Sequence, residues 1–564
     1  MFSKPSVSPA EASSRANRDA PRRFRDNVGD LFLSGAVPAK RARTIFEDAD
    51  ASGAAGVGDL AGVGDTSHVH RDLLRKLKKG KKWKSAMEFT IPVWNKKQCT
   101  AGEGKVKIML PHEVVHSVAH WNKEYAEFFS FENLRRECAD HMNAAKTELG
   151  LAGEQVLPLA LWLDGVPVKY DRSESLEVVT VSFPHLSGDI GTLRLPVAAL
   201  YKSHMVKDGS TMDAIMKVVA WSLGSLAEGF FPKYGPDGEE LQGKRGKLAG
   251  KPLACKAVLC EVRGDWAAYK STFRLPGWAE KEACCFRCRA NKTDIDFRDC
   301  SLDARWRQLP MTHWEILARL HEKHGSMPPL FAAPGFKSSI FTIDWLHSCD
   351  QGVCADFMGN LMFAIYSTLP GSEKDKLSTM FAHIQAYYAE TAAESRLDNL
   401  TIGMIRAKSS KSPKLKAKAG ECRALVSWIA PACRDFLNPE NPEHAAIAHA
   451  GRYLAQCYAC LSEANFQQEK LAVACRKFLV IYCALESRCQ DDCRWRFKPK
   501  MHIWQHLCEE SRDSPARFWV YRDEDFGGTL SHIATRRGGA NTAHAISGMV
   551  LDMFYANNQV PVVA

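Results

Sequence analysis

The sequence predicts an α/β protein whose layered core is interrupted by a large helical region. Strand, strand, strand, helix and strand patterns follow one another between residues 157 and 262, and helical periodicity then dominates until about residue 495. At 564 residues, with 45% hydrophobic and 25% charged residues, the chain is long enough for two or three domains. This composition excludes collagen-like and wholly disordered proteins.

The first 152 residues are expected to lie outside that core. Residues 1–85 are rich in Ala, Ser, Gly, Asp and Arg, and they contain near-repeats of the type Gly-Val-Gly-Asp. Such low complexity predicts a disordered basic arm. Residues 86–152 are predicted to be a helical segment, because apolar side chains recur at three- and four-residue steps between residues 111 and 149.

The core itself is predicted in two parts that flank a helical insertion. Residues 153–290 form the first part, with strands at 157–168, 176–183, 192–201 and 254–262 and a helix at 212–231. Residues 291–495 form the insertion, with helices at 353–366, 375–390, 421–436, 443–463 and 466–487. Residues 496–564 form the final part.

Two aspartates follow strands of the first part, each beside a glycine. Asp164 precedes Gly165 at the end of the first strand, and Asp265 follows Gly264 after the fourth. Carboxylates at the ends of neighbouring strands can share Mg²⁺, which prefers oxygen ligands, and a third acid would complete such a site. Taken alone, each aspartate also fits a surface turn.

Five motifs in this order resemble the successive signatures of CACTA-type (CMC superfamily) DDE transposases. They are Leu163-Asp164-Gly165-Val166-Pro167-Val168, Gly264-Asp265, Cys285-Phe286-Arg287-Cys288, Asp344-Trp345-Leu346-His347 and Lys498-Pro499-Lys500-Met501-His502-Ile503-Trp504-Gln505-His506. The resemblance covers residues 155–540. It implies an RNase H-like mixed sheet with a large α-helical insertion, and catalytic acids Asp164 and Asp265 that bind Mg²⁺ or Mn²⁺.

The third acid follows the His-x-x-x-His element on a helix in that family. The matching stretch is residues 521–528, in which we choose Glu524 as the third catalytic and metal-binding acid. Asp525 is its nearest rival, followed by Glu509 and Glu510. Acids at this point would also suit the first turn of a helix, where the helix dipole favours negative charge.

A structural zinc site is the second expectation. Cys285 and Cys288 have zinc-knuckle spacing, and His502 and His506 lie one helical turn apart, so the four side chains suit a tetrahedral Cys₂His₂ site. The resemblance includes both elements. Cys457 and Cys460 form a rival pair, but their apolar helical context favours ordinary core cysteines.

Asp344 and His347 match a further motif of the resemblance. In that family they lie close to the catalytic centre. Two interpretations stay open for them, because they would either orient a phosphate or hold the insertion in place.

Local basic runs predict a nucleic-acid partner, although the net charge of +10 is modest for this length. The run 406–418 carries the candidate DNA contacts, and the run 71–84 is a second candidate; a solvated surface explains either run equally well. Arg536 and Arg537 are expected near the active site. The five candidate DNA-binding lysines are Lys408, Lys411, Lys414, Lys416 and Lys418.

The location follows from other features. Nineteen cysteines without a repeating framework suit a reducing compartment, and no apolar run is long enough for a membrane span or a secretion signal. Lys40-Arg41-Ala42-Arg43 resembles a nuclear-import signal. We therefore expect a nuclear protein without a membrane partner; the sequence does not decide whether it forms a homo-oligomer.

The leading functional prediction is a transposase that cuts and joins DNA by two-metal phosphoryl transfer. The first 150 residues show no compact zinc finger or helix-turn-helix, so the alternative is a catalytically inactive, transposon-derived DNA-binding or scaffold protein. The sequence 112–116, His-Glu-Val-Val-His, fits a zinc metallopeptidase, but Ala119 and Asn122 break the longer motif. Phosphate-binding loops, dinucleotide fingerprints and nucleophile elbows are missing.

Overall fold

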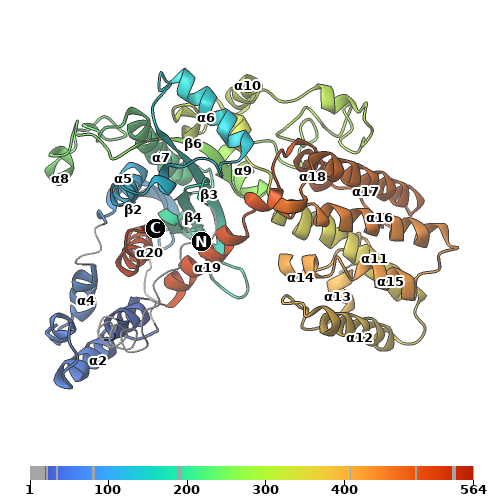
Figure 1. Cartoon of the computed structure of the whole chain (residues 1–564), viewed down its shortest axis with the longest axis horizontal. Coiled ribbons are helices and arrows are strands. Elements are labelled where there is room, and N and C mark those ends of the chain that lie inside the picture. The colour runs from blue at the N-terminus through green and yellow to red at the C-terminus, as the bar shows by residue number, and fades with distance from the viewer. Residues whose placement is uncertain are drawn as a thin grey trace, which may run out of the picture.

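The computed structural model describes an α/β core joined to a helical lobe (Figure 1). The description covers residue 20 and residues 23–33, 36–78, 83–186, 193–406, 408–489, 492–536 and 542–562. One continuous apolar core runs through both parts and includes the fully buried Trp162, Trp345 and Trp504. No helix among these residues combines the length and the apolar character needed to cross a membrane.

The core is built on a four-stranded mixed sheet, as the sequence predicts. Its strands are β3 (Val156–Pro167), β4 (Ser175–Ser182), β5 (Arg194–Tyr201) and β6 (Lys256–Arg263). Their spatial order is β5-β4-β3-β6. Neighbours β5, β4 and β3 are antiparallel, whereas β6 runs parallel to β3. The predicted mixed α/β fold is therefore confirmed.

A short extended segment continues the sheet beyond β6. Phe341 forms a parallel bridge with Val262, and the amide of Thr342 donates to the Val262 carbonyl at 3.0 Å. The parallel pairing of β3 with β6 ends at Trp162 and Arg263, and the third parallel segment ends at Thr342; an aspartate stands two residues after each of these points. These aspartates are Asp164, Asp265 and Asp344.

Helices cover the sheet and connect its strands. Helix α6 (Arg136–Glu148) packs against Val258 and Cys260 of β6, and α7 (Ser210–Glu228) also contacts β6. After the lobe, the chain returns to the sheet through α18 (Pro499–Glu510), α19 (Tyr521–Arg536) and α20 (Ala543–Asn557). Smaller helices are α8 (Gly243–Gly246) and α9 (Trp266–Phe273), with 3₁₀ turns at Ala126–Phe129, Lys202–His204, Arg305–Gln308, Pro329–Ala332, Ser338–Ile340, Glu463–Asn465 and Pro515–Arg517.

The lobe lies beside the sheet at the right of Figure 1 and contains the predicted helices. It starts with a π-helix, η7 (Leu346–Cys354), whereas the preceding α10 (His313–His324) lies near α6 at the top of the view. The predicted helix at 421–436 is two helices, because the chain makes a turn after Ala424. The remaining helices are α11 (Ala355–Thr368), α12 (Glu373–Thr391), α13 (Ile402–Ile405), α14 (Ala419–Ala424), α15 (Ile429–Phe436), α16 (Pro442–Ala459) and α17 (Gln468–Arg488).

The sequence predicts a disordered arm at residues 1–85, whereas the described part of this segment, residues 23–33 and 36–78, contains packed helices. Helices α2 (Ala39–Ala51), α3 (Gly58–Ala61) and α4 (Val69–Lys78) bury a small core of their own, around Phe32 and Phe46. Ala556 of α20 belongs to the same core. The apolar residues are sparse along the sequence, and only their packing across three short helices makes them a core.

The prediction of a wholly helical segment at 86–152 is also wrong. Strands β1 (Met87–Asn95) and β2 (Thr100–Ile108) form an antiparallel hairpin before α5 (Pro111–Asn122). Phe89, Ile91 and Val93 alternate with more exposed residues, which is the two-residue period of a strand with one buried face. The helical part of the prediction holds for α5 and α6.

Candidate metal centres

The first candidate site lies at the edge of the sheet, just after the point where β3 stops pairing with β6. Asp164 of β3, His347 of η7 and Glu524 of α19 form a group in which one ligand atom from each side chain lies within 4.8 Å of the others. Side chains alternate along a strand, so Asp164 points to the same face as Trp162, the face that α19 covers. The fold therefore brings together three residues that lie far apart in the sequence.

Asp265 lies beside this group but is not a member of it. Its side chain caps α9 by accepting a hydrogen bond from the Ala268 amide at 2.5 Å. The preceding Gly264 permits this position, because a Cβ there would lie only 2.8 Å from the Leu163 carbonyl oxygen. Asp265 is close enough for its charge to raise the pKa of Asp164, after the larger effects of burial and of Glu524.

Asp344 fixes the positions of residues in this group through hydrogen bonds. It is buried, and one of its oxygens, Oδ2, accepts hydrogen bonds from both the backbone amide and Nδ1 of His347, at 2.7 and 2.8 Å. Its other oxygen accepts from the Val520 amide at 3.0 Å, just before α19 begins. One carboxylate thus fixes the histidine ring and the start of the helix that carries Glu524.

A buried ion-pair network holds α19 on the sheet next to Glu524. Asp523 is fully buried and contacts Arg194 of β5 at 2.5 Å and Arg263 of β6 at 3.6 Å. Arg263 also pairs with Glu261 at 3.0 Å. The three adjacent acids of residues 523–525 therefore have different environments. Asp523 faces the sheet, Glu524 faces Asp164, and Asp525 is exposed.

The electrostatics of the site favour a cation. Burial, together with the negative charges of Glu524 and Asp265, raises the pKa of Asp164 well above its usual value. Burial likewise raises the pKa of Glu524 despite its hydrogen bond with Asp164, and the charge of Asp344 adds to the effect. Burial opposes a charged His347, but Asp344, Asp164 and Asp265 outweigh it and raise its pKa. A divalent ion would relieve this concentration of negative charge.

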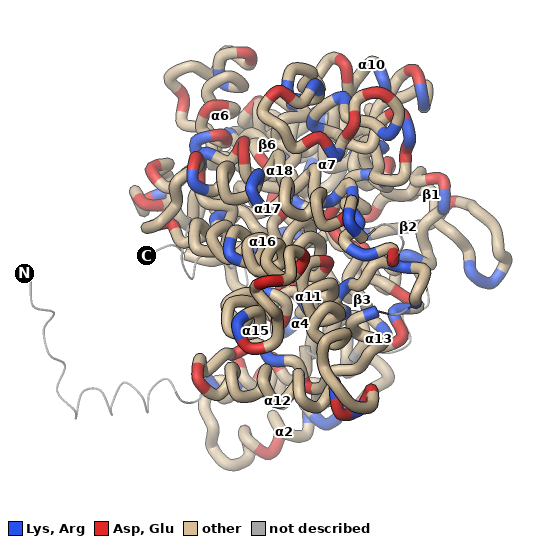
Figure 2. Tube along the Cα trace, turned by 90° about the vertical axis from the view of Figure 1, so that its right-hand side faces the viewer, with Lys and Arg blue, Asp and Glu red and all other residues tan. Residues whose placement is uncertain are grey.

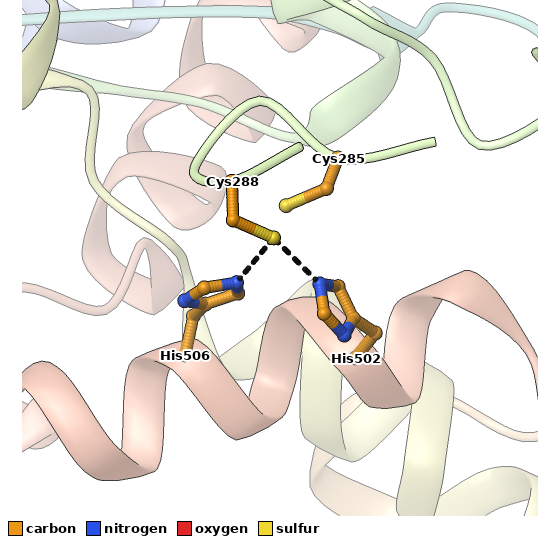
Figure 3. A group of neighbouring side chains, drawn as sticks. All are labelled: Cys285, Cys288, His502 and His506. Carbon is orange, nitrogen blue, oxygen red and sulfur yellow. Dashed lines mark hydrogen bonds between the residues drawn. The ribbon is translucent and has the colours of Figure 1, made fainter. Parts of the chain in front are cut away.

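The second candidate site is the predicted four-residue cluster. Cys285 and Cys288 lie on a loop and face His502 and His506, which project from one side of α18 (Figure 3). All four are buried, and one ligand atom from each lies within 4.8 Å of the rest. The Cys288 Sγ atom lies 3.2 Å from His502 Nε2 and 3.3 Å from His506 Nε2. These separations approach the ~3.5 Å expected between ligands of a tetrahedral zinc ion.

The surroundings of the cluster are compatible with a metal site. The amides of Arg287 and Ala290 donate to the cysteine sulfurs at 3.2 and 3.4 Å. His506 Nδ1 lies 2.5 Å from Glu510, which orients Nε2 toward the cysteines. Burial opposes a charged Cys285, yet Cys288 and the two histidines outweigh it and hold its pKa well below the usual value. The four residues thus form a cluster compatible with zinc.

The rival residues lie elsewhere or have other partners. Glu509 pairs with Arg307, and Glu510 pairs with Arg287 and His506, so neither reaches the Asp164 group. Cys457 and Cys460 are buried in the apolar core of the lobe, which fits their interpretation as core cysteines.

The predicted DNA-binding lysines occupy the segment between α13 and α14. Lys414 is half-buried and donates to the Gln351 carbonyl at 2.8 Å, whereas the others are exposed on the lobe, namely Lys408, Lys411, Lys416 and Lys418. In the view of Figure 2, Lys and Arg are mixed with Asp and Glu along the trace. Arg537 and the side chain of Arg536 lie outside the described residues.

Lys500 is a basic residue at the acidic site to which the sequence analysis assigns no role. Its Nζ donates to the His347 carbonyl at 3.1 Å, and the side chain lines a small cavity together with Asp265 and Asp344. Burial and the nearby Lys414 lower its pKa. Lys500 lies two residues before His502 in the motif at residues 498–506, and its place in that motif is the only feature of the sequence that could have indicated a role.

The metallopeptidase motif has structural partners in place of a shared ion. His112 lies 2.8 Å from the Ser222 hydroxyl, Glu113 pairs with Arg245 at 2.7 Å, and His116 accepts from the Ala254 amide at 3.0 Å. Burial lowers the pKa of His112 to about 3 and that of His116 to about 4. Both rings are therefore neutral; His112 is buried, and His116 is partly exposed.

Comparison with known proteins adds no assignment. No protein-family model matches the chain, and no curated protein matches it either. The chemistry available to the two clusters therefore follows from their own geometry.

Proposed function

We propose that the protein is a DDE-type polynucleotidyl transferase of the transposase class, which cuts and joins DNA with the help of divalent metal. The convergence of Asp164 and Glu524, with Asp265 and His347 beside them, is the observation that supports it most. Acidic groups whose pKa is raised by burial and by one another, at the edge of a sheet, are characteristic of a metal-dependent site.

The arrangement of the sheet supports an RNase H-like core. Three consecutive strands run antiparallel, and the fourth is parallel to the first and lies beside it. The helical lobe then separates this sheet from α19, which returns to β3 with the third acid. This order of elements is the one that the sequence motifs imply.

The residues fit a divalent cation, either Mg²⁺ or Mn²⁺. Asp164 and Glu524 offer carboxylate oxygens to it, and Asp265 offers the oxygen that does not cap α9. When bound, such ions supply charge stabilisation at the phosphate and activation of the attacking hydroxyl. The protein's own contribution is to hold the acids in register, through Asp344 and the Asp523 ion pairs.

The Cys285 cluster is proposed as a structural zinc site. It joins the loop after α9 to α18, and α18 contacts η7, the helix that carries His347. Zinc would thus clamp the end of the insertion close to the catalytic acids.

DNA is the proposed substrate, and the nucleus is the proposed location. Lys500 and Lys414 bind carbonyls of the same π-helix next to the acids, so they could position a phosphate backbone there. Four further lysines of the run continue along the lobe surface. The nuclear-import tetrapeptide lies at the start of α2.

Cleavage of DNA tests the proposal. The full-length protein, loaded with zinc, is expected to nick or join DNA only when Mg²⁺ or Mn²⁺ is added. Asp164→Asn should abolish this activity, whereas Asp171→Asn, an exposed aspartate after the same strand, should retain it. Metal-independent DNA binding without cleavage in any DNA format would favour the inactive DNA-binding alternative.

A further inference from the structure

His347 is the one nitrogen donor in the acidic group that the structure describes. It stands on the π-helix η7, three residues after Asp344, and its ring reaches the same space as the carboxylates of Asp164 and Glu524. A group of acids alone would say little about which ion binds. His347, whose ring is fixed by Asp344, is an independent observation that indicates which ion binds.

The geometry fixes which ring nitrogen faces the acids. The backbone amide and Nδ1 of His347 both lie within 2.8 Å of Asp344 Oδ2, so Nδ1 is assigned as the protonated nitrogen. Nε2 then carries the lone pair and lies 3.7 Å from Glu524 Oε1. That separation is too long for a hydrogen bond and suits two ligands that share one ion at ~2.1 Å each.

The support behind the ring is that of a metal-binding histidine. Ligand histidines usually donate their other N–H to a carboxylate or carbonyl, which fixes the tautomer and the ring orientation. Asp344 does this, and it is itself fixed by the Val520 amide. The Oε1 atom of Glu524 is buried without a hydrogen-bond partner among the described residues, as expected of an oxygen reserved for an ion.

We propose that His347 is a metal ligand through Nε2 and that it makes this site selective for Mn²⁺ over Mg²⁺. Mg²⁺ strongly prefers oxygen ligands in an ideal octahedron. Mn²⁺ shares the preference for carboxylates. As a transition-metal ion it also binds an imidazole nitrogen more readily than Mg²⁺ does, although less tightly than the later members of the series. This inference rests on the proposed function, because it assumes that the acidic group binds a divalent ion.

Electron spin-echo spectroscopy of bound Mn²⁺ tests the proposal without relying on activity. The 564-residue chain is first loaded with one equivalent of zinc, and unbound zinc is removed, so that the Cys285 cluster does not compete for manganese. Wild-type protein should then show ¹⁴N coupling from one imidazole, and Mn²⁺ should displace Mg²⁺ in a competition titration. His347→Gln should lose the coupling and bind Mn²⁺ roughly 10- to 100-fold more weakly, with Mg²⁺ affinity nearly unchanged.

The matched control is His383→Gln. His383 also pairs with a carboxylate, Asp435 at 3.0 Å, but it lies on α12 of the lobe. This variant should keep both the coupling and the affinity, and thermal unfolding of each variant verifies that it folds. Mn²⁺ bound without ¹⁴N coupling, and with equal affinity in His347→Gln, would overturn the inference alone. Binding of neither Mn²⁺ nor Mg²⁺ would overturn the proposed function as well.

Discussion

Gly527 of α19 lies directly against Trp162 of β3. A Cβ at position 527 would lie 2.9 Å from the Trp162 ring and 2.6 Å from a methyl of Val166. This close approach brings the helix down onto the strand whose next residues are Leu163 and Asp164. The packing of Gly527 on Trp162, together with the Asp523 ion pairs, thus holds Glu524 near Asp164.

The first prediction concerns this contact. Gly527→Ala should lower the free energy of unfolding by ~1–3 kcal/mol, because the buried Trp162 and Val166 leave no space for the methyl group. The neighbouring Gly528→Ala is the control, since its Cβ would meet no atom within 4 Å. It should raise the free energy of unfolding by up to ~1 kcal/mol through helix propensity. Equal effects in chemical denaturation would contradict the packing argument.

The second prediction concerns the buried Asp523. Its replacement by asparagine leaves Arg194 and Arg263 without their shared carboxylate and should cost ~3–5 kcal/mol of stability. Asp525→Asn, two residues further along α19 and exposed, should change stability by no more than ~0.5 kcal/mol. Denaturation midpoints measure both, and similar midpoints would show that the ion pairs do not anchor the helix.

Zinc content gives the third prediction. Cys285→Ser and His506→Ala should each lose one zinc per chain and lower Tm by about 5 °C or more, because four ligands close the cluster. Cys457→Ser should keep its zinc, since that cysteine lies in the apolar core. Elemental analysis with thermal melts provides the readout. Full zinc occupancy in Cys285→Ser would exclude this cluster as the site.

The fourth prediction is a pH dependence from Asp350. Burial raises the pKa of this carboxyl to about 7, although the hydroxyls of Tyr458 and Tyr521 donate to it. The folded protein therefore keeps a proton that the unfolded chain releases near pH 4. As the pH rises from about 4 to 7, the unfolded chain is ionised while the folded protein is not, so the free energy of unfolding falls over this range.

Asp350→Asn should remove that part of the pH dependence, which is worth a few kcal/mol at about 1.4 kcal/mol per pKa unit. The exposed Asp303→Asn serves as the control and should leave the profile unchanged. Denaturation at pH 4, 6 and 8 measures the effect. If the free energy of unfolding of Asp350→Asn changed with pH as steeply as that of the wild type, Asp350 would be ionised in the folded protein.

The strands of the core could be predicted because turn residues separate their apolar runs, although β3 continues past the predicted end at Asp164-Gly165 to Pro167. The hairpin β1–β2 was missed because its two-residue alternation is short and precedes a strong helical pattern. The packed helices α2 to α4 could not be predicted, since each buries at most three apolar side chains and needs the others to form a core.

The candidate site, too, could be predicted only in part from the sequence. Motif order indicated Asp164, Asp265 and the cysteine and histidine pairs, but only the fold separates the three adjacent acids by direction, with Glu524 toward Asp164. The cap made by Asp265 and the orientation of His347 by Asp344 depend on hydrogen bonds that no spacing encodes. The position of Lys500 at the site depends on its hydrogen bond to the His347 carbonyl of the π-helix, which the sequence does not reveal.

The most direct test of the central claim compares two neighbouring acids of α19 in metal-dependent DNA cleavage. Glu524→Gln should reduce the rate at least ~100-fold, because the carboxylate that faces Asp164 is lost. Asp525→Asn should cleave at the wild-type rate, because that side chain faces solvent. Equal rates in the two variants, or loss of cleavage in Asp525→Asn alone, would contradict the site described here.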